Sequence, residues 1–192
     1  EIHGALLDSI HIATVGTVLG VAMARPFGFL AARNVTPWLW VNWLARMVLI
    51  SARSINTLVF ALFFVEVFGP GALARALAIA FHSIGFVGRL FSEALEATSP
   101  GPIEALRAAG APAASVISFG YWPQVAPAFW SLVLFRWDIN VRESIVLGLV
   151  GAGGVGMVLD NAMNLFLWGR VAMVLIAILG VVRSEEHTSE LQ

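Results

Sequence analysis

Six polar or charged residues within nine positions carry most of the binding chemistry of this sequence: Arg136, Asp138, Asn140, Arg142, Glu143 and Ser144. Arginine guanidinium groups bind small oxyanions through bidentate, charge-assisted hydrogen bonds, so this cluster predicts contacts with an anion. Asp138 and Arg142 are also spaced i, i+4, and on one helix they would form a structural ion pair instead. The sequence leaves both interpretations open.

A glycine-rich run at 151–156 matches the G-x-G-x-x-G pattern of dinucleotide-binding loops. That fingerprint requires a preceding strand and an acidic residue about 20 positions later, whereas this run lies between apolar segments. The alternative is a non-helical link between membrane spans, which acts as a hinge or lines a gate. The candidate gate residues of this link are Gly151, Gly153, Gly154 and Gly156.

The composition places the chain in a membrane. Of 192 residues, 59% are hydrophobic and 12% are charged, whereas soluble domains have about 45–50% apolar residues. The basic residues are all arginines and the net charge is −1, so nucleic-acid binding is not expected. There is no cysteine, and His3 and His11 stand eight positions apart, so no metal site is expected either.

Five apolar segments predict an all-α, polytopic membrane protein with about five transmembrane helices. They are 9–32, with an interruption at Arg25-Pro26, then 36–68, 72–98, 123–140 and 165–182. His82 and Ser83 lie within the third segment, where a polar group is costly and is a functional candidate for that reason. They line a path for a solute or form a hydrogen bond between helices.

Both termini suggest an incomplete or altered sequence. Glu1 is not an initiator methionine, so we expect an N-terminal segment with one further span to be missing. The last ten residues, 183–192, match a translated sequencing adapter, and we expect them to be a non-native tail.

One short stretch, Glu104 to Pro123, cannot span the bilayer. Pro102 suits the first position of a helix, Glu104 would then lie in the favourable first turn, and Gly110 can end the helix. Pro112 suits the start of a second short helix. Eight helical residues rise only about 12 Å, against about 30 Å for the bilayer core. The stretch must therefore lie on or outside the membrane.

The spacing of this stretch resembles the EAA loop of ABC-importer permeases, which reads Glu-Ala-Ala, three residues, Gly, nine residues, Ile, one residue, Leu-Pro. Glu104, Ala105, Gly110 and Pro123 match that pattern. Three positions depart from it, with a different residue at each: Leu106 for the second Ala, Gly120 for Ile and Trp122 for Leu.

Longer stretches extend the resemblance to the permeases of phosphonate ABC importers: 28–34, 82–96, 99–111 and 146–156. One departure concerns residues 54–57, Ser-Ile-Asn-Thr, where the family has a Ser-Ile-Pro-Glu-like word. Asn56 and Thr57 lack the proline bend and the acid, which leaves a break of that helix in question.

The resemblance implies a permease domain over 1–182 with a methionine-importer-like fold and a cytoplasmic coupling loop at 100–123. It implies a homodimer in the bacterial inner membrane that binds an ABC ATPase subunit and a periplasmic or lipid-anchored phosphonate-binding protein. The residues that would contact the ATPase are Glu104, Ala105, Leu106, Arg107, Gly110 and Pro123.

The implied activity is uptake of phosphonates by alternating access, not catalysis. The chain has no lysine to complete a P-loop, so ATP and Mg²⁺ are expected on the partner ATPase and no cofactor is expected here. One alternative is a related permease for phosphite, phosphate or methionine. The more distant alternative is a membrane scaffold or enzyme.

Overall fold

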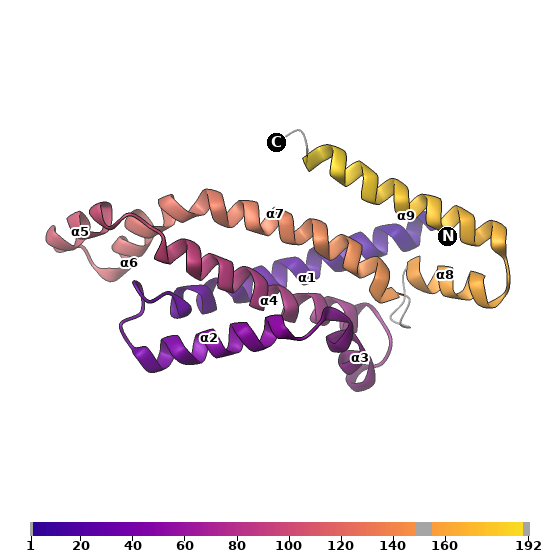
Figure 1. Cartoon of the computed structure of the whole chain (residues 1–192), viewed down its shortest axis with the longest axis horizontal. Coiled ribbons are helices and arrows are strands. Elements are labelled where there is room, and N and C mark those ends of the chain that lie inside the picture. Colours follow the sequence, from indigo (N-terminus) through magenta and orange to yellow (C-terminus); the bar gives the residue numbers. More distant parts are fainter. Residues whose placement is uncertain (1, 149–154, 190–192) are drawn as a thin grey trace. The chain divides into compact units, whose positions relative to one another are not determined.

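The described part of the chain consists of helices joined by turns and short loops (Figure 1). The computed structural model describes residues 2–148 and 155–189, and no strand occurs among them. The helices are α1 (Ile2–Ala31), α2 (Leu39–Ser54), α3 (Thr57–Phe68), α4 (Ala72–Glu96), α5 (Pro100–Ala108), α6 (Ala113–Ser115), a π-helix (Val116–Tyr121), α7 (Trp122–Leu147), α8 (Val155–Asn164) and α9 (Trp168–Ser189).

The helices form two compact units. Unit 1 comprises residues 1–19, 55–82 and 137–192, and unit 2 comprises residues 20–54 and 83–136. Three long helices, α1, α4 and α7, contribute residues to both units. The loop that resembles a coupling element belongs entirely to unit 2.

Length and composition identify the membrane spans. Among the described residues, α1 over Gly4–Ala31 and α4 are long and apolar enough to cross a bilayer, and α2 and α3 counted together give a third span. Helix α7 has 26 residues but carries the polar cluster, and the apolar part of α9 is the shorter Trp168–Gly180. The predicted all-α membrane architecture is therefore confirmed.

Three predicted boundaries are wrong. Pro26 does not interrupt the first span, since α1 continues through it, and proline is tolerated within membrane helices. Helix α7 begins at Trp122 and runs seven residues beyond Asn140, to Leu147, since the polar residues there bond to neighbouring helices. The last helix begins at Trp168, not at Leu165.

The helix over 36–68 does break, although the family's proline is absent. Helix α2 ends at Ser54 and α3 begins at Thr57. Asn56 has extended backbone angles, and its side chain accepts a hydrogen bond from the N–H of Leu58 at 2.9 Å. Asparagine is a preferred N-cap residue, so it starts a new helix where the resemblance predicts a proline bend.

In unit 1, α1 and α4 approach closely at a glycine. A Cβ atom on Gly16 would lie 2.8 Å from Cγ2 of Ile79 and 2.9 Å from the carbonyl oxygen of Ala76. Small residues permit such close contact between membrane helices. The core around this contact also includes Ile12, Phe64 and Leu147.

In unit 2, aromatic side chains form the centre of the core. Phe91 of α4 makes edge contacts with Phe129 and Trp122 of α7, at centroid distances of 4.9 and 6.4 Å. The guanidinium carbon of Arg25 lies 4.8 Å from the Phe129 ring and 5.2 Å from the Trp122 ring. These contacts join α1, α4 and the start of α7 directly behind the predicted coupling loop.

Candidate functional site

The first helix of the predicted coupling loop starts earlier than expected. Helix α5 begins at Pro100, with Ser99 as its N-cap residue, so Pro102 is its third residue. Glu104 is consequently the fifth residue and lies outside the first turn, and the expected dipole contribution at that position is wrong. Pro100 takes the first position because its fixed φ and its missing N–H both suit it.

Gly110 ends this helix as predicted. Its φ is +74°, and its N–H donates to the carbonyl of Arg107 at 3.0 Å. The N–H of Ala111 donates to the carbonyl of Leu106, also at 3.0 Å. These are the two hydrogen bonds of a Schellman motif, which favours glycine at the left-handed position.

The second half of the loop is a wide helical turn that leads directly into α7. The short α6 continues into the π-helix, which ends where the N–H of Trp122 bonds to the carbonyl of Ile117. Pro123 follows immediately and has no N–H to continue this wide pattern. Figure 1 shows α5 and α6 together where α4 ends and α7 begins.

Two departures from the EAA pattern lie against each other. A Cβ atom on Gly120 would stand 3.3 Å from Cδ1 of Leu106 and 3.4 Å from Cγ1 of Ile103. Leu106 is larger than the family's alanine, and Gly120 is smaller than the family's isoleucine. The large residue on α5 therefore occupies space that the small residue on the π-helix leaves free.

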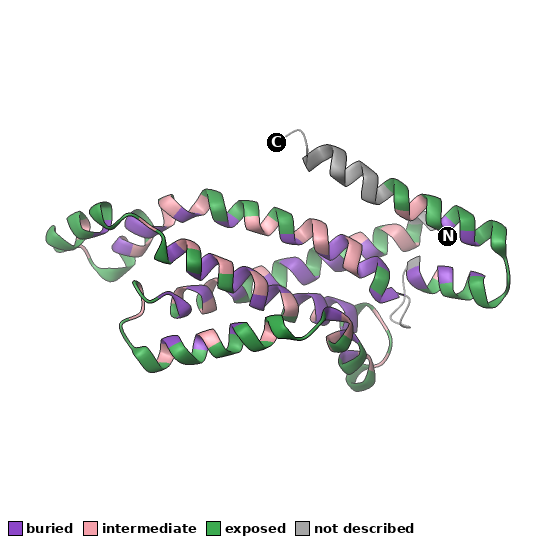
Figure 2. Cartoon of the chain, in the orientation of Figure 1, coloured by how far each residue is buried: buried purple, intermediate pink, exposed green. Residues whose placement is uncertain are grey.

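The outer face of α5 is exposed (Figure 2). Glu104, Ala105, Arg107 and Gly110 are exposed, while Leu106 is half-buried over the unit 2 core. The outward surface is thus formed by small residues with one acidic and one basic side chain. Such a surface lets a partner's groove approach the helix backbone closely.

Pro123 and Gln124 lie where the loop ends and α7 begins. Pro123 is exposed in the first turn of α7. The side-chain oxygen of Gln124 accepts from the N–H of Ser99 at 2.9 Å, and its Nε2 donates to the carbonyl of Gly120 at 2.7 Å. Gln124 therefore connects the residue before α5 to the end of the loop. No local pattern in the sequence indicates this role.

The residues of the polar cluster are divided between the two units. In unit 2, Arg136 is buried and its Nε donates to Oγ of Ser83 at 3.1 Å. The guanidinium groups of Arg136 and Arg53 both lie near the Phe86 ring, at 5.5 and 5.8 Å from its centroid. Arg53 was not among the predicted residues.

In unit 1, two members of the cluster pair with each other on α7, and the others bond to neighbouring helices. Arg142 and Asp138 form the i, i+4 ion pair at 2.7 Å. Two bonds join α7 to α1: Nδ2 of Asn140 donates to Oγ1 of Thr17 at 2.8 Å, and the Ser144 hydroxyl donates to the carbonyl of Ser9 at 2.9 Å. The Thr57 hydroxyl of α3 donates to Oε2 of Glu143 at 2.9 Å. Nδ1 of His82 on α4 bonds to the carbonyl of Ile55, in the break before α3, at 3.0 Å.

The bonds of Asp138 with Arg142, and those of His82 and Ser83, agree with the structural alternatives stated for these residues. The place of every cluster residue on a solute path stays a prediction. Of the glycine link, Gly156 lies within α8 and is buried, which contradicts a non-helical conformation at that position. Gly151, Gly153 and Gly154 lie outside the described residues.

Comparison with known proteins identifies relatives over nearly the whole chain. A family model described as "Binding-protein-dependent transport system inner membrane component" matches residues 24–182. The phosphite transport system permease protein PtxC of Stutzerimonas stutzeri is 39% identical over 177 residues, which are 92% of this chain. The phosphate-import permease protein PhnE of Mycolicibacterium smegmatis is 38% identical over 180 residues, or 94% of the chain.

The chain spans 64% of the length of the first relative and 34% of the second. Among solved structures, a chain of the MetNI methionine ABC transporter in inward-facing conformations superposes with a TM-score of 0.80. The superposition covers 98% of this chain and 93% of that chain, at 19% sequence identity. At this identity the likeness concerns the fold alone, and it confirms the predicted fold of the methionine-importer type.

Proposed function

Because the chain belongs to the family of binding-protein-dependent transport system inner membrane components, we propose that it is the permease subunit of an ATP-driven importer. The proposed substrates are small phosphorus oxyanions, namely phosphonate, phosphite or phosphate. The observation that carries this proposal is the similarity, over more than nine tenths of the chain, to permeases named for phosphite and phosphate.

The geometry of the loop supports a docking role for α5. Glu104, Ala105, Arg107 and Gly110 form an exposed face, and Ile103 and Leu106 anchor the opposite face in the unit 2 core. A helix held in this way transmits a push from a partner because its inner face cannot slide freely. We infer that an ATPase subunit, which binds ATP and Mg²⁺, docks on this face.

The proposed assembly is a homodimer that binds two ATPase copies and receives its substrate from a binding protein. Closure of the ATPase pair would move the docking helices and open the path to one side of the membrane and then to the other. We propose that Arg136 and Ser83 face this path, where a buried arginine suits an oxyanion.

Uptake by a reconstituted complex tests the function. Proteoliposomes that contain this chain and its partner ATPase are loaded with ATP and supplied with the binding protein. Phosphite, phosphate and methylphosphonate are offered as labelled substrates, with methionine as the comparison. We expect ATP-dependent uptake of at least one phosphorus oxyanion and none of methionine.

Two results would overturn the proposal. Uptake of methionine without uptake of any phosphorus oxyanion would refute the substrate class. Uptake that does not depend on ATP would refute the importer mechanism. Arg136→Gln should lower uptake, whereas Arg170→Gln, at an exposed arginine of α9, serves as the matched control and should leave it unchanged.

A further inference from the structure

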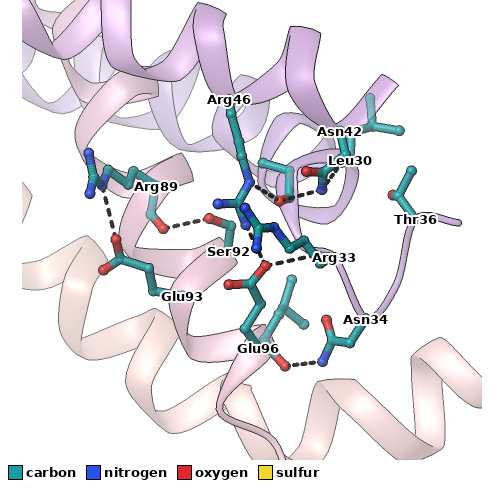
Figure 3. Close-up of polar contacts among 12 residues, drawn as sticks. Leu30, Arg33, Asn34, Thr36, Asn42, Arg46, Arg89, Ser92, Glu93 and Glu96 are labelled. Atoms are coloured by element: carbon teal, nitrogen blue, oxygen red, sulfur yellow. Dashed lines mark hydrogen bonds and ion pairs between the residues drawn. The ribbon is translucent and has the colours of Figure 1, made fainter. Parts of the chain in front are cut away.

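Glu96, the last residue of α4, connects the end of α1 and the middle of α2 to the end of α4 (Figure 3). Its Oε1 accepts a hydrogen bond from the backbone N–H of Arg33 at 2.8 Å and pairs with Nη2 of Arg46. Arg33 lies two residues after the end of α1, and Arg46 lies in α2. A single carboxylate oxygen therefore connects α1, α2 and α4 within unit 2.

Arg46 strengthens this junction through a second contact. Its Nε donates to the carbonyl of Ala31, the last residue of α1, at 3.0 Å. Nδ2 of Asn42 donates to the same carbonyl at 2.7 Å. Carbonyl groups at a helix end have no partner within their own helix, so these two side chains of α2 complete the end of α1.

The junction lies next to the start of the coupling loop. Helix α5 begins at Pro100, four residues after Glu96. The carbonyl of Leu95 accepts from Nδ2 of Asn34 at 2.6 Å, and the hydroxyl of Tyr121 donates to the carbonyl of Asn34 at 2.9 Å. Both ends of the loop are therefore bonded to the segment that follows α1.

We propose that Glu96 is a positioning residue for coupling, which makes the end of α1, the middle of α2 and the end of α4 move with α5 as one body. This inference rests on the proposed function of α5 as a docking helix. Charge-assisted hydrogen bonds are about twice as strong as neutral ones, and the Glu96 side chain is only 31% exposed. Helix α4 has 25 residues, about 38 Å, and carries the displacement into the membrane.

Glu93 provides a matched control on the same helix. It lies three residues before Glu96 and pairs with Arg89 at 2.9 Å, also on α4. Figure 3 shows both glutamates with their arginine partners. The Glu93 pair has similar chemistry but ties α4 only to itself, so its loss should leave the junction intact.

The first experiment measures the junction in the full-length chain alone, in lipid nanodiscs. Because the chain has no cysteine, cysteines introduced at the exposed positions Leu39 and Ala109 carry the only spin labels. We expect Glu96→Gln to broaden the distance distribution about twofold and Glu93→Gln to leave it as in the parent. Equal distributions in all three proteins would overturn the proposal.

The second experiment measures solute transported per ATP hydrolysed by the reconstituted complex. We expect Glu96→Gln to lower this ratio about tenfold, the factor that corresponds to the loss of about 1.4 kcal/mol from a charged hydrogen bond. Glu93→Gln should not change it. If Glu96 served stability alone, its loss would lower the yield of complex and leave the ratio unchanged, and that result would overturn the proposal.

The two experiments separate this inference from the proposed function. If the parent complex shows no ATP-dependent uptake, the proposed function fails and with it the coupling role of Glu96. The distance measurement then still decides whether Glu96 holds α1, α2 and α4 together.

Discussion

Leu106→Ala and Gly120→Ile should each destabilise the chain and should compensate each other in the double variant. The EAA pattern has the opposite sizes at these positions, a small residue on α5 and a large one on the following turn. The positions are in direct contact here, because a Cβ atom on Gly120 would stand 3.3 Å from Cδ1 of Leu106. Both departures from the EAA pattern follow if the large and the small residue of this one contact have exchanged places, and we call this the size exchange.

The distances set the expected magnitudes. The branches of an isoleucine at position 120 would extend about 1.5 Å beyond Cβ, towards Ile103, whose Cα would lie 3.6 Å from that Cβ. Overpacking of this kind costs about 1–3 kcal/mol. Leu106 is half-buried, so Leu106→Ala should cost about 2 kcal/mol, the low end for leucine truncations.

If the two substitutions were independent, the double variant would lose about 4 kcal/mol. We expect it to lose less than about 2 kcal/mol, because the isoleucine fills the volume that the leucine leaves. The coupling free energy of about 2 kcal/mol is within the range for residues in contact.

Thermal unfolding of the purified chain in detergent measures this cycle. For a chain of this length, 1 kcal/mol lowers Tm by about 2–4 °C, so each single variant should lower Tm by about 4–8 °C and the double variant by less than that, whereas additive effects would lower it by about 8–16 °C. Gly101→Ala provides the control, because a Cβ there meets no atom within 4 Å, and its effect should add to that of Leu106→Ala. A double variant that loses the full additive amount would refute the size exchange.

Three further outcomes are expected. Gly110→Val forces a β-branched residue to a φ of +74° and should cost about 1–2 kcal/mol; it should also uncouple ATP hydrolysis from transport, which parallel ATPase and uptake assays would reveal. Asn56→Ala removes an N-cap hydrogen bond and should lower Tm by about 2–4 °C, whereas Asn56→Asp should retain stability. Gln124→Leu removes the bonds to Ser99 and Gly120, so the Ser99 amide should exchange its hydrogen about tenfold faster, as measured by mass spectrometry. An unchanged exchange rate would contradict the role of Gln124 in holding the two ends of the loop together.

Several features of the chain depend on composition and local conformation, and the sequence alone was sufficient to predict them. Hydrophobic content predicted an all-α membrane protein. Gly110 predicted the end of α5, because the left-handed conformation at that position favours glycine irrespective of the surroundings. Asp138 and Arg142 were predicted as an alternative ion pair, since residues four apart meet on any helix.

Local patterns did not predict features that depend on distant residues. The start of α5 was misplaced because two prolines, Pro100 and Pro102, suit a helix start equally well. The break before α3 was in question because the family's proline is absent there, and the N-cap role of Asn56 was not considered.

Only the tertiary structure decided how the loop is held. Glu96 and Arg46 are 50 positions apart, and Ser83 and Arg136 are 53 positions apart. Neither pair has a sequence signal, because side chains on different helices meet only after those helices have packed. The same holds for Leu106 and Gly120, which depart from a family pattern when considered singly and fit one contact when considered together. Composition and turn residues thus determined the class of protein and the end of the first helix in its predicted coupling loop, and packing determined which side chains connect that loop to the membrane helices.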